Sequence, residues 1–339
     1  TARDETSMAL DIKPDALAAV LARTTGADVQ VTRIDALSGG ASSATFAVKA
    51  SKDGADWPLI MQCSAAGEPA PGAMAKRTQA RLQEVARKAG LPVAETVAIL
   101  EAEDGLGDGF VMTRIDGESL APRYLRLPEY AAAREAMTAQ CATALARLHA
   151  LPRSAFDGLP LTGGSPQALL AKSFAAYRAF GIELPAYDLA FAWLKERLPD
   201  TEPTALVHGD FRSGNFIVGT DGLRAILDWE LGHFGDPLED MGWLCGNAWR
   251  FGNWQKPVGG FGEREALYAA YEAAGGAKVD RDAVHMWEVW GTLRWGMSCV
   301  MLVSDHLSGR VPSVERAAIG RRISENELDL LYLFKHGSI

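Results

Sequence analysis

The chain has 339 residues, of which 48% are hydrophobic and 23% are charged, as in an ordinary folded globular protein. Its 34 basic and 43 acidic residues give a formal net charge of -9, which argues against nucleic-acid binding driven by phosphate neutralisation. The first residues are polar, and the most apolar late stretch contains Glu288 and Arg294. We therefore expect no signal peptide and no membrane partner.

Cysteine usage points to the redox environment of the chain. Cys63, Cys141, Cys245 and Cys299 are scattered, and no two of them form a CxxC pair. This pattern is typical of reduced, mostly buried thiols and not of a disulfide framework or a zinc site. We expect a cytoplasmic protein.

The first third of the chain is predicted to be rich in strands. Leu17, Val20 and Leu21 recur at helical spacing and predict a helix over residues 14–24, which Gly26 ends. A second helix is predicted over residues 74–89. Apolar and alternating runs predict strands at residues 29–37, 44–48, 58–63, 96–100 and 110–115.

From residue 127 onward the pattern is mostly helical, with short strands around one motif. The pattern alone therefore predicts an α+β chain with two lobes. We place the boundary so that residues 1–115 form one lobe and residues 116–339 form the other.

That motif reads VHGDFRSGN over residues 207–215, and Asp228 follows thirteen residues after Asn215. Protein kinases use the same separation of an Asp and an Asn on their catalytic loop, followed by a metal-binding Asp. In such an arrangement Asp210 takes or orients the proton of an acceptor hydroxyl. Asn215 and Asp228 supply the oxygen ligands that Mg²⁺ prefers.

Three segments carry a family resemblance, and they span residues 208–215, 226–230 and 235–240. They resemble the aminoglycoside phosphotransferase and choline kinase-like superfamily, and most closely the branch related to the kinase-like domains of certain acyl-CoA dehydrogenases. The resemblance implies a two-lobed protein-kinase-like fold, with a small antiparallel-sheet N-lobe, a large helical C-lobe and a nucleotide between them. It also implies ATP, or another nucleoside triphosphate, and Mg²⁺ as cofactors.

Two further stretches are candidates for nucleotide binding. A glycine turn with Gly39, Gly40, Ser42 and Ser43 joins two predicted strands. It can present backbone N–H groups to phosphates, although such a turn is also typical of an ordinary hairpin. In the resembling family the turn covers the ATP phosphates. The strand and loop after residue 110 correspond to the adenine-binding hinge, with Met112, Arg114 and Ile115 as its candidate contacts.

The chain departs from the family pattern at the cation that holds the phosphates. Gln62 stands on the third strand where a Lys or Arg is expected, and Gln79 stands where its acidic partner is expected. Three interpretations follow: another cation serves, the nucleotide binds weakly, or phosphate transfer has been lost. Arg212, two residues after Asp210, is the substitute cation that the sequence predicts.

Other residues of the motif region have structural interpretations. His208 is expected to shape the loop, Asp236 to cap the helix that follows, and Asp240 to brace the loop from that helix. Glu230 is a possible contact of the metal or the substrate. The C-terminal tryptophans are expected mainly in the core, with lining of an apolar cleft as the alternative.

The sequence therefore favours an ATP- and Mg²⁺-dependent O-phosphotransferase that acts on a small hydroxylated molecule, either a hydroxyacyl metabolite or an aminoglycoside-like compound. Gln62 supports an alternative, a pseudokinase-like protein that binds a nucleotide or ligand with little or no catalysis. A metal-dependent phosphohydrolase is less favoured, because it needs more His and carboxylate ligands than these motifs supply.

Overall fold

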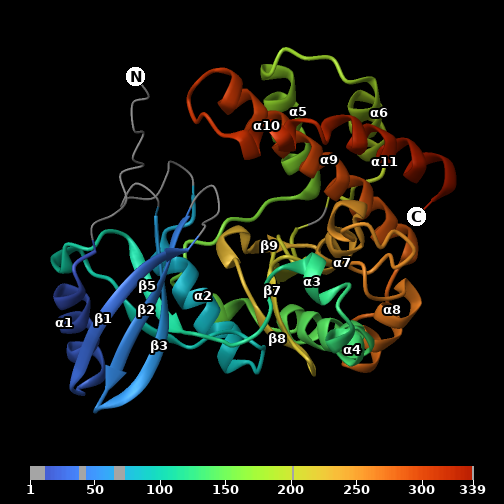
Figure 1. The fold of residues 1–339 in the computed structure, drawn as a ribbon. Coiled ribbons are helices and arrows are strands. Elements are labelled where there is room, and N and C mark those ends of the chain that lie inside the picture. The colour runs from blue at the N-terminus through green and yellow to red at the C-terminus, as the bar shows by residue number, and fades with distance from the viewer. Residues whose placement is uncertain (1–11, 38–42, 65–72, 201, 338–339) are drawn as a thin grey trace. The chain divides into compact units, whose positions relative to one another are not determined.

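The computed structural model describes residues 12–37, 43–64, 73–200 and 202–337. The chain divides into two compact units (Figure 1). The first unit runs to Asp116 and includes two later segments, Ser154–Pro160 and Asp228–Leu231. The second unit contains Gly117–Arg153, Leu161–Leu227 and the chain from Gly232 onward. Asp228 therefore belongs to the first unit, whereas Asp210 and Asn215 belong to the second.

A five-stranded antiparallel sheet forms the centre of the first unit, in the order β1-β2-β3-β5-β4. Its strands are β1 (Val29–Leu37), β2 (Ser43–Lys52), β3 (Ala55–Ser64), β4 (Thr96–Ile99) and β5 (Gly109–Thr113). Alternate residues of β2 and β3, such as Phe46, Val48 and Met61, are buried, as the two-residue period of a strand requires. Asp53 and Gly54 connect these strands with positive φ angles of 51° and 81°, which a tight hairpin turn favours.

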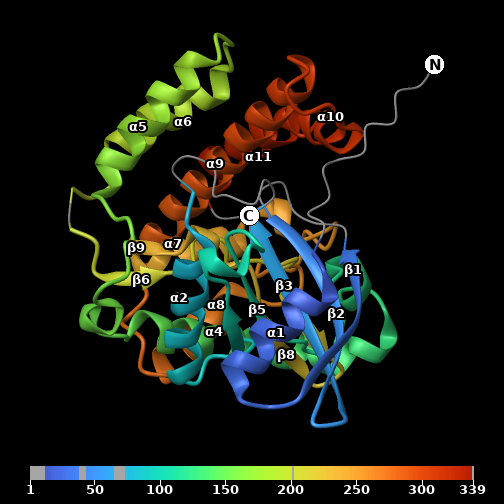
Figure 2. The ribbon, with the colours of Figure 1, turned by 90° about the vertical axis from the view of Figure 1, so that its left-hand side faces the viewer.

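Two helices pack on this sheet. Helix α1 (Pro14–Thr25) buries Leu17, Val20 and Leu21 and ends at Gly26, whose φ of 69° is left-handed. It packs against β1 (Figure 2) and also against β4, and α2 (Lys76–Lys88) packs against β3, β4 and β5. The sequence predicts that α2 begins at residue 74, but it begins at Lys76. Asp108, which follows a glycine-rich turn, accepts the Lys76 N–H at 3.0 Å and caps the helix from outside.

The second unit is mainly helical, as predicted. Its helices are α3 (Ala121–Tyr124), α4 (Ala131–His149), α5 (Pro166–Ala179), α6 (Pro185–Lys195), α7 (Pro237–Cys245), α8 (Arg264–Ala273), α9 (Arg281–Leu307), α10 (Val314–Gly320) and α11 (Ile323–His336). Two small antiparallel sheets pair β6 (Ala205–Val207) with β9 (His233–Gly235) and β7 (Phe216–Gly219) with β8 (Gly222–Ile226). Figures 1 and 2 show α10 and α11 beside the long helix α9.

The core of the second unit is aromatic and surrounds α9. Trp287, Trp290 and Leu293 of α9 pack with Tyr177 of α5 and Tyr187 of α6. Helix α7 approaches α9 closely at Gly242, because a Cβ at this position would lie 2.5 Å from the carbonyl carbon of Trp287. Of the tryptophans expected in the core, Trp254 has 61% of its surface exposed and Trp295 is half-buried.

All four cysteines are free and buried, as their scattered positions predict. Burial raises the pKa of the Cys63 thiol to about 12, so this thiol is an inert packing residue. Within the described part of the chain, the helices lack the combination of length and apolar character that crossing a membrane requires.

Candidate active site

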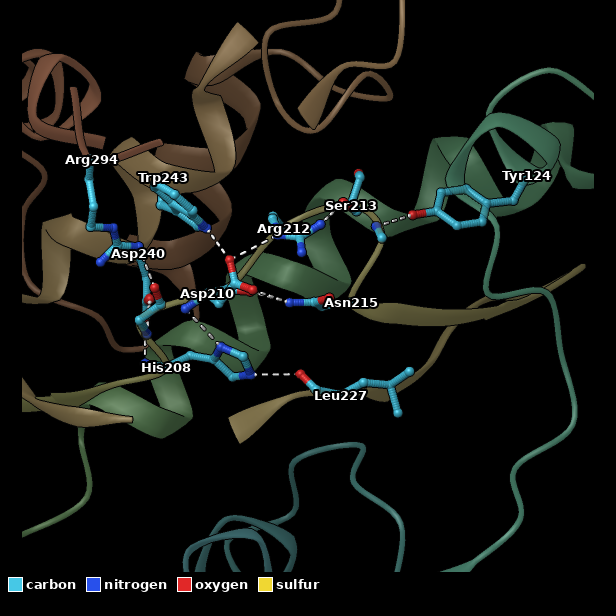
Figure 3. Close-up of polar contacts among 12 residues, drawn as sticks. Tyr124, His208, Asp210, Arg212, Ser213, Asn215, Leu227, Asp240, Trp243 and Arg294 are labelled. Carbon is cyan, nitrogen blue, oxygen red and sulfur yellow. Dashed lines mark hydrogen bonds and ion pairs between the residues drawn. The ribbon is translucent and has the colours of Figure 1, made fainter. Parts of the chain in front are cut away.

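The loop between β6 and β7, residues 208–215, is anchored by helix α7. Asp236 begins this helix and accepts the Leu238 N–H at 2.8 Å, with Pro237 at the first helical position, as its sequence predicts. One turn later, Asp240 accepts the backbone N–H of His208 at 2.8 Å and that of Gly209 at 2.9 Å (Figure 3). Asp240 therefore fixes the start of the loop, which is the bracing role expected from the sequence.

The charge of Asp240 is stabilised inside the protein. Burial opposes ionisation of this carboxyl group, but the hydrogen bond and electrostatic interaction with His149, together with the backbone hydrogen bond from His208, outweigh burial and lower its pKa. His149 Nε2 lies 3.3 Å from Asp240 Oδ2, and its Nδ1 lies 3.0 Å from the Tyr271 hydroxyl. Helices α4, α7 and α8 thus meet at one polar cluster beneath the loop.

His208 shapes the loop from within. Its Nδ1 accepts the Asp210 N–H at 3.1 Å, and its Nε2 donates to the Leu227 carbonyl at 3.0 Å. These partners require a neutral ring with its proton on Nε2, because a backbone N–H can only donate. Burial lowers the pKa of His208 and favours the same neutral form. The contacts agree with the loop-shaping role expected from the sequence.

Asp210 lies at the centre of the loop as a hydrogen-bond acceptor. Its Oδ1 accepts from Arg212 Nε at 2.9 Å and from Trp243 Nε1 at 2.7 Å, and its Oδ2 accepts from Asn215 Nδ2 at 2.6 Å. A carboxylate offers about four acceptor positions. Among the described residues these donors occupy three of them, so the remaining position lies on Oδ2. That position suits an incoming hydroxyl group.

The side chain of Asn215 is held through its amide nitrogen. Its amide nitrogen donates both to the Asp210 carbonyl at 3.0 Å and to Asp210 Oδ2, so its amide oxygen is the atom suited to a cation. Asn215 also accepts the Leu227 N–H through its backbone carbonyl at 2.8 Å, and Asp228 is the next residue. Asp228 has a left-handed φ of 62°, an uncommon conformation that occurs preferentially at functional sites. Both oxygen-bearing side chains fit the chemistry of Mg²⁺.

Arg212 is bound to Asp210 and to an aromatic neighbour. Besides its bond to Asp210, its guanidinium group lies over the Trp249 ring, 4.3 Å from the centroid, a favourable cation–π geometry. From the sequence we expect this side chain to serve as the phosphate-binding cation. In the structure it orients the Asp210 carboxylate, and 22% of the side chain is exposed.

Three residues support the loop without any signal in the sequence motif. Trp243 donates to Asp210, the Tyr124 hydroxyl accepts the Gly214 N–H at 3.1 Å, and Arg294 donates to the Gly209 carbonyl. Arg294 also covers the Trp243 ring at 3.9 Å from its centroid. They come from α7, α3 and α9, so only the fold brings them to the loop (Figure 3).

The first unit contains a second polar cluster, which includes Ser43, Gln62 and Glu230. Gln79 Nε2 donates to Gln62 Oε1 at 3.3 Å, so the two neutral amides pair as their aligned positions predict. Lys76 joins this pair, since its Nζ donates to Gln79 Oε1 at 2.9 Å. The same Nζ donates to Ser43 Oγ at 2.6 Å and to Glu230 Oε2 at 3.2 Å.

The remaining predicted nucleotide contacts lie around β5 or outside the described residues. Met112 is buried and packs with Phe110. The Arg114 N–H donates to the Pro58 carbonyl at 3.2 Å, so the sheet uses this group, and Ile115 is half-buried. Gly39, Gly40 and Ser42 lie outside the described residues.

Comparison with known proteins places this geometry in context. The phosphotransferase enzyme family matches residues 33–287. Acyl-CoA dehydrogenase family member 10 of Mus musculus is 28% identical over 212 residues, which are 61% of this chain and 19% of that protein. Family member 11 of the same species is 31% identical over 172 residues, which are 48% of this chain and 22% of that protein. The chain thus spans about a fifth of these curated relatives.

Solved structures share the fold over nearly the whole chain. A putative aminoglycoside phosphotransferase from Ralstonia eutropha is 20% identical, with a TM-score of 0.75 over 95% of this chain and 98% of that chain. A spectinomycin phosphotransferase bound to ADP and spectinomycin is 15% identical, with a TM-score of 0.62 over 97% of this chain and all of that chain. The architecture is therefore the kinase-like fold of small-molecule phosphotransferases.

Proposed function

Because the chain belongs to the phosphotransferase enzyme family, we propose that it is an O-phosphotransferase that uses ATP and Mg²⁺ to phosphorylate a hydroxyl group of a small molecule. The observation that carries this proposal is the acceptor position left on Asp210 Oδ2, while Trp243, Arg212 and Asn215 hold the rest of the carboxylate. A carboxylate held in this way has one fixed direction in which to receive a proton.

In the proposed phosphate transfer, Asp210 acts as the base. The acceptor hydroxyl donates to Asp210 Oδ2, its oxygen attacks the γ-phosphorus, and its proton passes to Asp210. The bond from the γ-phosphorus to the bridging oxygen breaks, and ADP leaves with the electron pair. Asn215 and Asp228 would hold Mg²⁺, which neutralises charge on the phosphates. Positioning and electrostatics supply most of the catalysis in such a reaction.

We assign the two units different tasks. The first unit binds the nucleotide through Ser43, Gln62 and the main chain near Met112, Arg114 and Ile115, together with the glycine turn that contains Gly39, Gly40 and Ser42. The second unit supplies the base and its support. The ADP bound to the spectinomycin phosphotransferase and the presence of one polar cluster within each unit support this division.

For the acceptor we favour a hydroxylated acyl compound over an aminoglycoside. The most similar relatives given above are named as acyl-CoA dehydrogenase family members, whereas the aminoglycoside enzymes resemble this chain at 20% identity or less. A chain similar to a part of proteins named as acyl-CoA dehydrogenase family members fits an acyl-bearing alcohol as its substrate.

The test is ADP release with Mg²⁺ and ATP across a panel of hydroxyacyl compounds, amino sugars and simple alcohols. We expect release that depends on one acceptor class, and a loss of roughly 100-fold or more in Asp210→Asn, because a general base contributes that much. Asp221→Asn, at an exposed position beside Arg224, is the matched control and should keep the wild-type rate. Equal rates for Asp210→Asn and Asp221→Asn would contradict the assignment.

The neutral pair of Gln62 and Gln79 favours a second candidate, a protein that binds the nucleotide without transferring phosphate. It predicts that Mg·ATP raises the melting temperature while no acceptor in the panel releases ADP. The intact set of Asp210, Asn215 and Asp228 favours the transferase.

A further inference from the structure

Lys76 is a buried lysine to which the motif assigns no role. It begins α2, and only 3% of it is exposed. Its Nζ lies within hydrogen-bond distance of Ser43 Oγ, Gln79 Oε1 and Glu230 Oε2. An ammonium group has three donors, and these partners from β2, α2 and the turn Trp229–Leu231 use all of them. A lysine held this completely has one defined position.

The position of Lys76 corresponds to the cation that the sequence lacks. Gln79 bonds to Gln62 through its amide nitrogen and to Lys76 through its amide oxygen. Gln79 therefore links the ammonium group of Lys76 to Gln62, which stands at the strand position where a cation is expected. The acidic partner is also present, because Glu230 pairs with Lys76 at 3.2 Å. The ion pair exists in this chain, but it is built from different positions.

Ser43 makes this cluster able to receive a phosphate oxygen. It is the nearest partner of Lys76, at 2.6 Å, and it is the first residue of β2. A hydroxyl group can donate as well as accept a hydrogen bond. Ser43 can therefore release the ammonium group and donate to the same phosphate.

We propose that Lys76 is the cation that binds the nucleotide phosphates, with Glu230 as its acidic partner, in place of the usual lysine on the third strand. This inference rests on the proposed function for the identity of the ligand. A phosphate oxygen replaces a neutral acceptor of Lys76, either Ser43 or Gln79, because hydrogen bonds between ionised groups are the stronger ones. Glu230 keeps the ammonium group of Lys76 aligned. Lys76 then supplies the positive charge for the nucleotide phosphates that Gln62 lacks.

The experiment compares Lys76→Met with Lys88→Met by titration calorimetry with Mg·ATP and with adenosine. Lys88 belongs to the same helix, but 71% of its side chain is exposed, so its variant controls for loss of a helix charge. We expect Lys76→Met to weaken Mg·ATP binding about tenfold or more and to change adenosine binding less than about twofold, because only ATP carries phosphates. Lys88→Met should bind both ligands like the wild type.

A second variant tests whether a cation on the third strand can restore the Mg·ATP affinity lost in Lys76→Met. In Lys76→Met combined with Gln62→Lys, the new ammonium group starts from the strand position that pairs with Gln79, and we expect it to restore most of the lost Mg·ATP affinity. Lys76→Arg keeps the charge and should lose less affinity than Lys76→Met. Unfolding curves without ligand show whether each variant is folded.

Several outcomes would overturn the role of Lys76. These are Mg·ATP affinity of Lys76→Met within about twofold of wild type, equal losses for ATP and adenosine, or no rescue by Gln62→Lys. A wild-type protein that binds Mg·ATP but transfers no phosphate refutes only the proposed function, because the binding ratios still test Lys76. A wild-type protein that does not bind Mg·ATP refutes both.

Discussion

The two units each contain a charged group enclosed by hydrogen-bond partners, and the two arrangements are opposite in sign. In the second unit the carboxylate of Asp210 accepts from three N–H donors. In the first unit the ammonium group of Lys76 donates to three oxygens. Asp210 is held by two neighbours in the sequence and one distant residue. Lys76 is held mainly by distant residues, so its cluster depends on the fold of the whole unit.

The comparison indicates which property a substitution in each cluster should change. A substitution on the loop of the second unit acts within a few residues, and its effect should appear first in catalysis. A substitution around Lys76 acts on β2, α2 and the turn Trp229–Leu231 together, and its effect should appear in nucleotide affinity. The predictions below test this contrast, from the largest expected effect to the smallest.

The largest effect is expected at Asp240, which braces the loop of the second unit. Asp240→Ala removes the acceptor of the His208 and Gly209 N–H groups in a fully buried place. We expect a loss of about 3 kcal/mol in the free energy of unfolding, because each unsatisfied buried donor costs on the order of 1–3 kcal/mol. Urea unfolding measures this loss. Asp282→Ala, at an exposed position of α9, is the control, and equal losses in both variants would refute the bracing role.

In the first unit, we expect stability to fall when Asp108 is replaced, because this residue caps α2 from another part of the chain. Asp108→Ala removes the acceptor of the Lys76 N–H and of the Ser64 hydroxyl group. We expect a cost of about 1.5 kcal/mol, near the upper range for a lost helix cap. Faster hydrogen exchange should appear in the first turn of α2. Asp56→Ala, at an exposed position, is the control. Unchanged hydrogen exchange in Asp108→Ala would show that the cap is dispensable.

Trp243 separates catalysis from stability in the second unit. Trp243→Phe keeps an aromatic ring but removes the N–H that donates to Asp210 at 2.7 Å. We expect kcat to fall about tenfold, which corresponds to a hydrogen bond worth about 1.4 kcal/mol, while KM for ATP stays unchanged. Trp254→Phe, at an exposed position, should leave both constants unchanged. A change in KM for ATP alone would mean that Trp243 serves the nucleotide.

The smallest effect concerns pH and His208. Burial lowers the pKa of this residue from its ordinary value of 6.5, so below that pH the unfolded chain binds a proton that the folded chain does not. Stability therefore falls as the pH falls below 6.5, by at most about 1.4 kcal/mol per pH unit for one group. Melting temperatures at pH 7.5 and 5.5 measure this loss. His208→Gln should show a smaller loss, and an equal loss would assign the effect to other groups.

Much of the second unit's site could be predicted from the sequence, because its main residues lie within one short motif. Asp210, Asn215, Asp236 and Asp240 lie in segments whose kinase-like spacing, family resemblance and helix-start residues predict a loop and a helix that braces it. The strands of the first unit were also predictable from their alternation. The period of a strand or a helix depends on residues close together in the chain, so it can be recognised in the sequence without knowledge of the fold.

The first unit's cluster could not be predicted in the same way. Lys76 stands beside Arg77 in a helix with further charges at Arg81 and Lys88, and such a pattern is typical of a solvated face. Its burial follows from Ser43 and Glu230, which are 33 and 154 residues away in the sequence. Contacts over such separations arise from the pairing of whole elements, which a local pattern does not encode.

Trp243, Trp249 and Trp295 form a contiguous aromatic series beside the loop, with ring centroids 5.0 Å apart in both adjacent pairs. Indole groups held this close and at fixed angles couple their electronic transitions, which makes them a source of near-ultraviolet circular dichroism. Because Trp243 touches Asp210 and Trp249 touches Arg212, we expect the arrival of a ligand at the loop to change the circular dichroism spectrum of the unmodified protein. Acceptor binding can therefore be followed without any label.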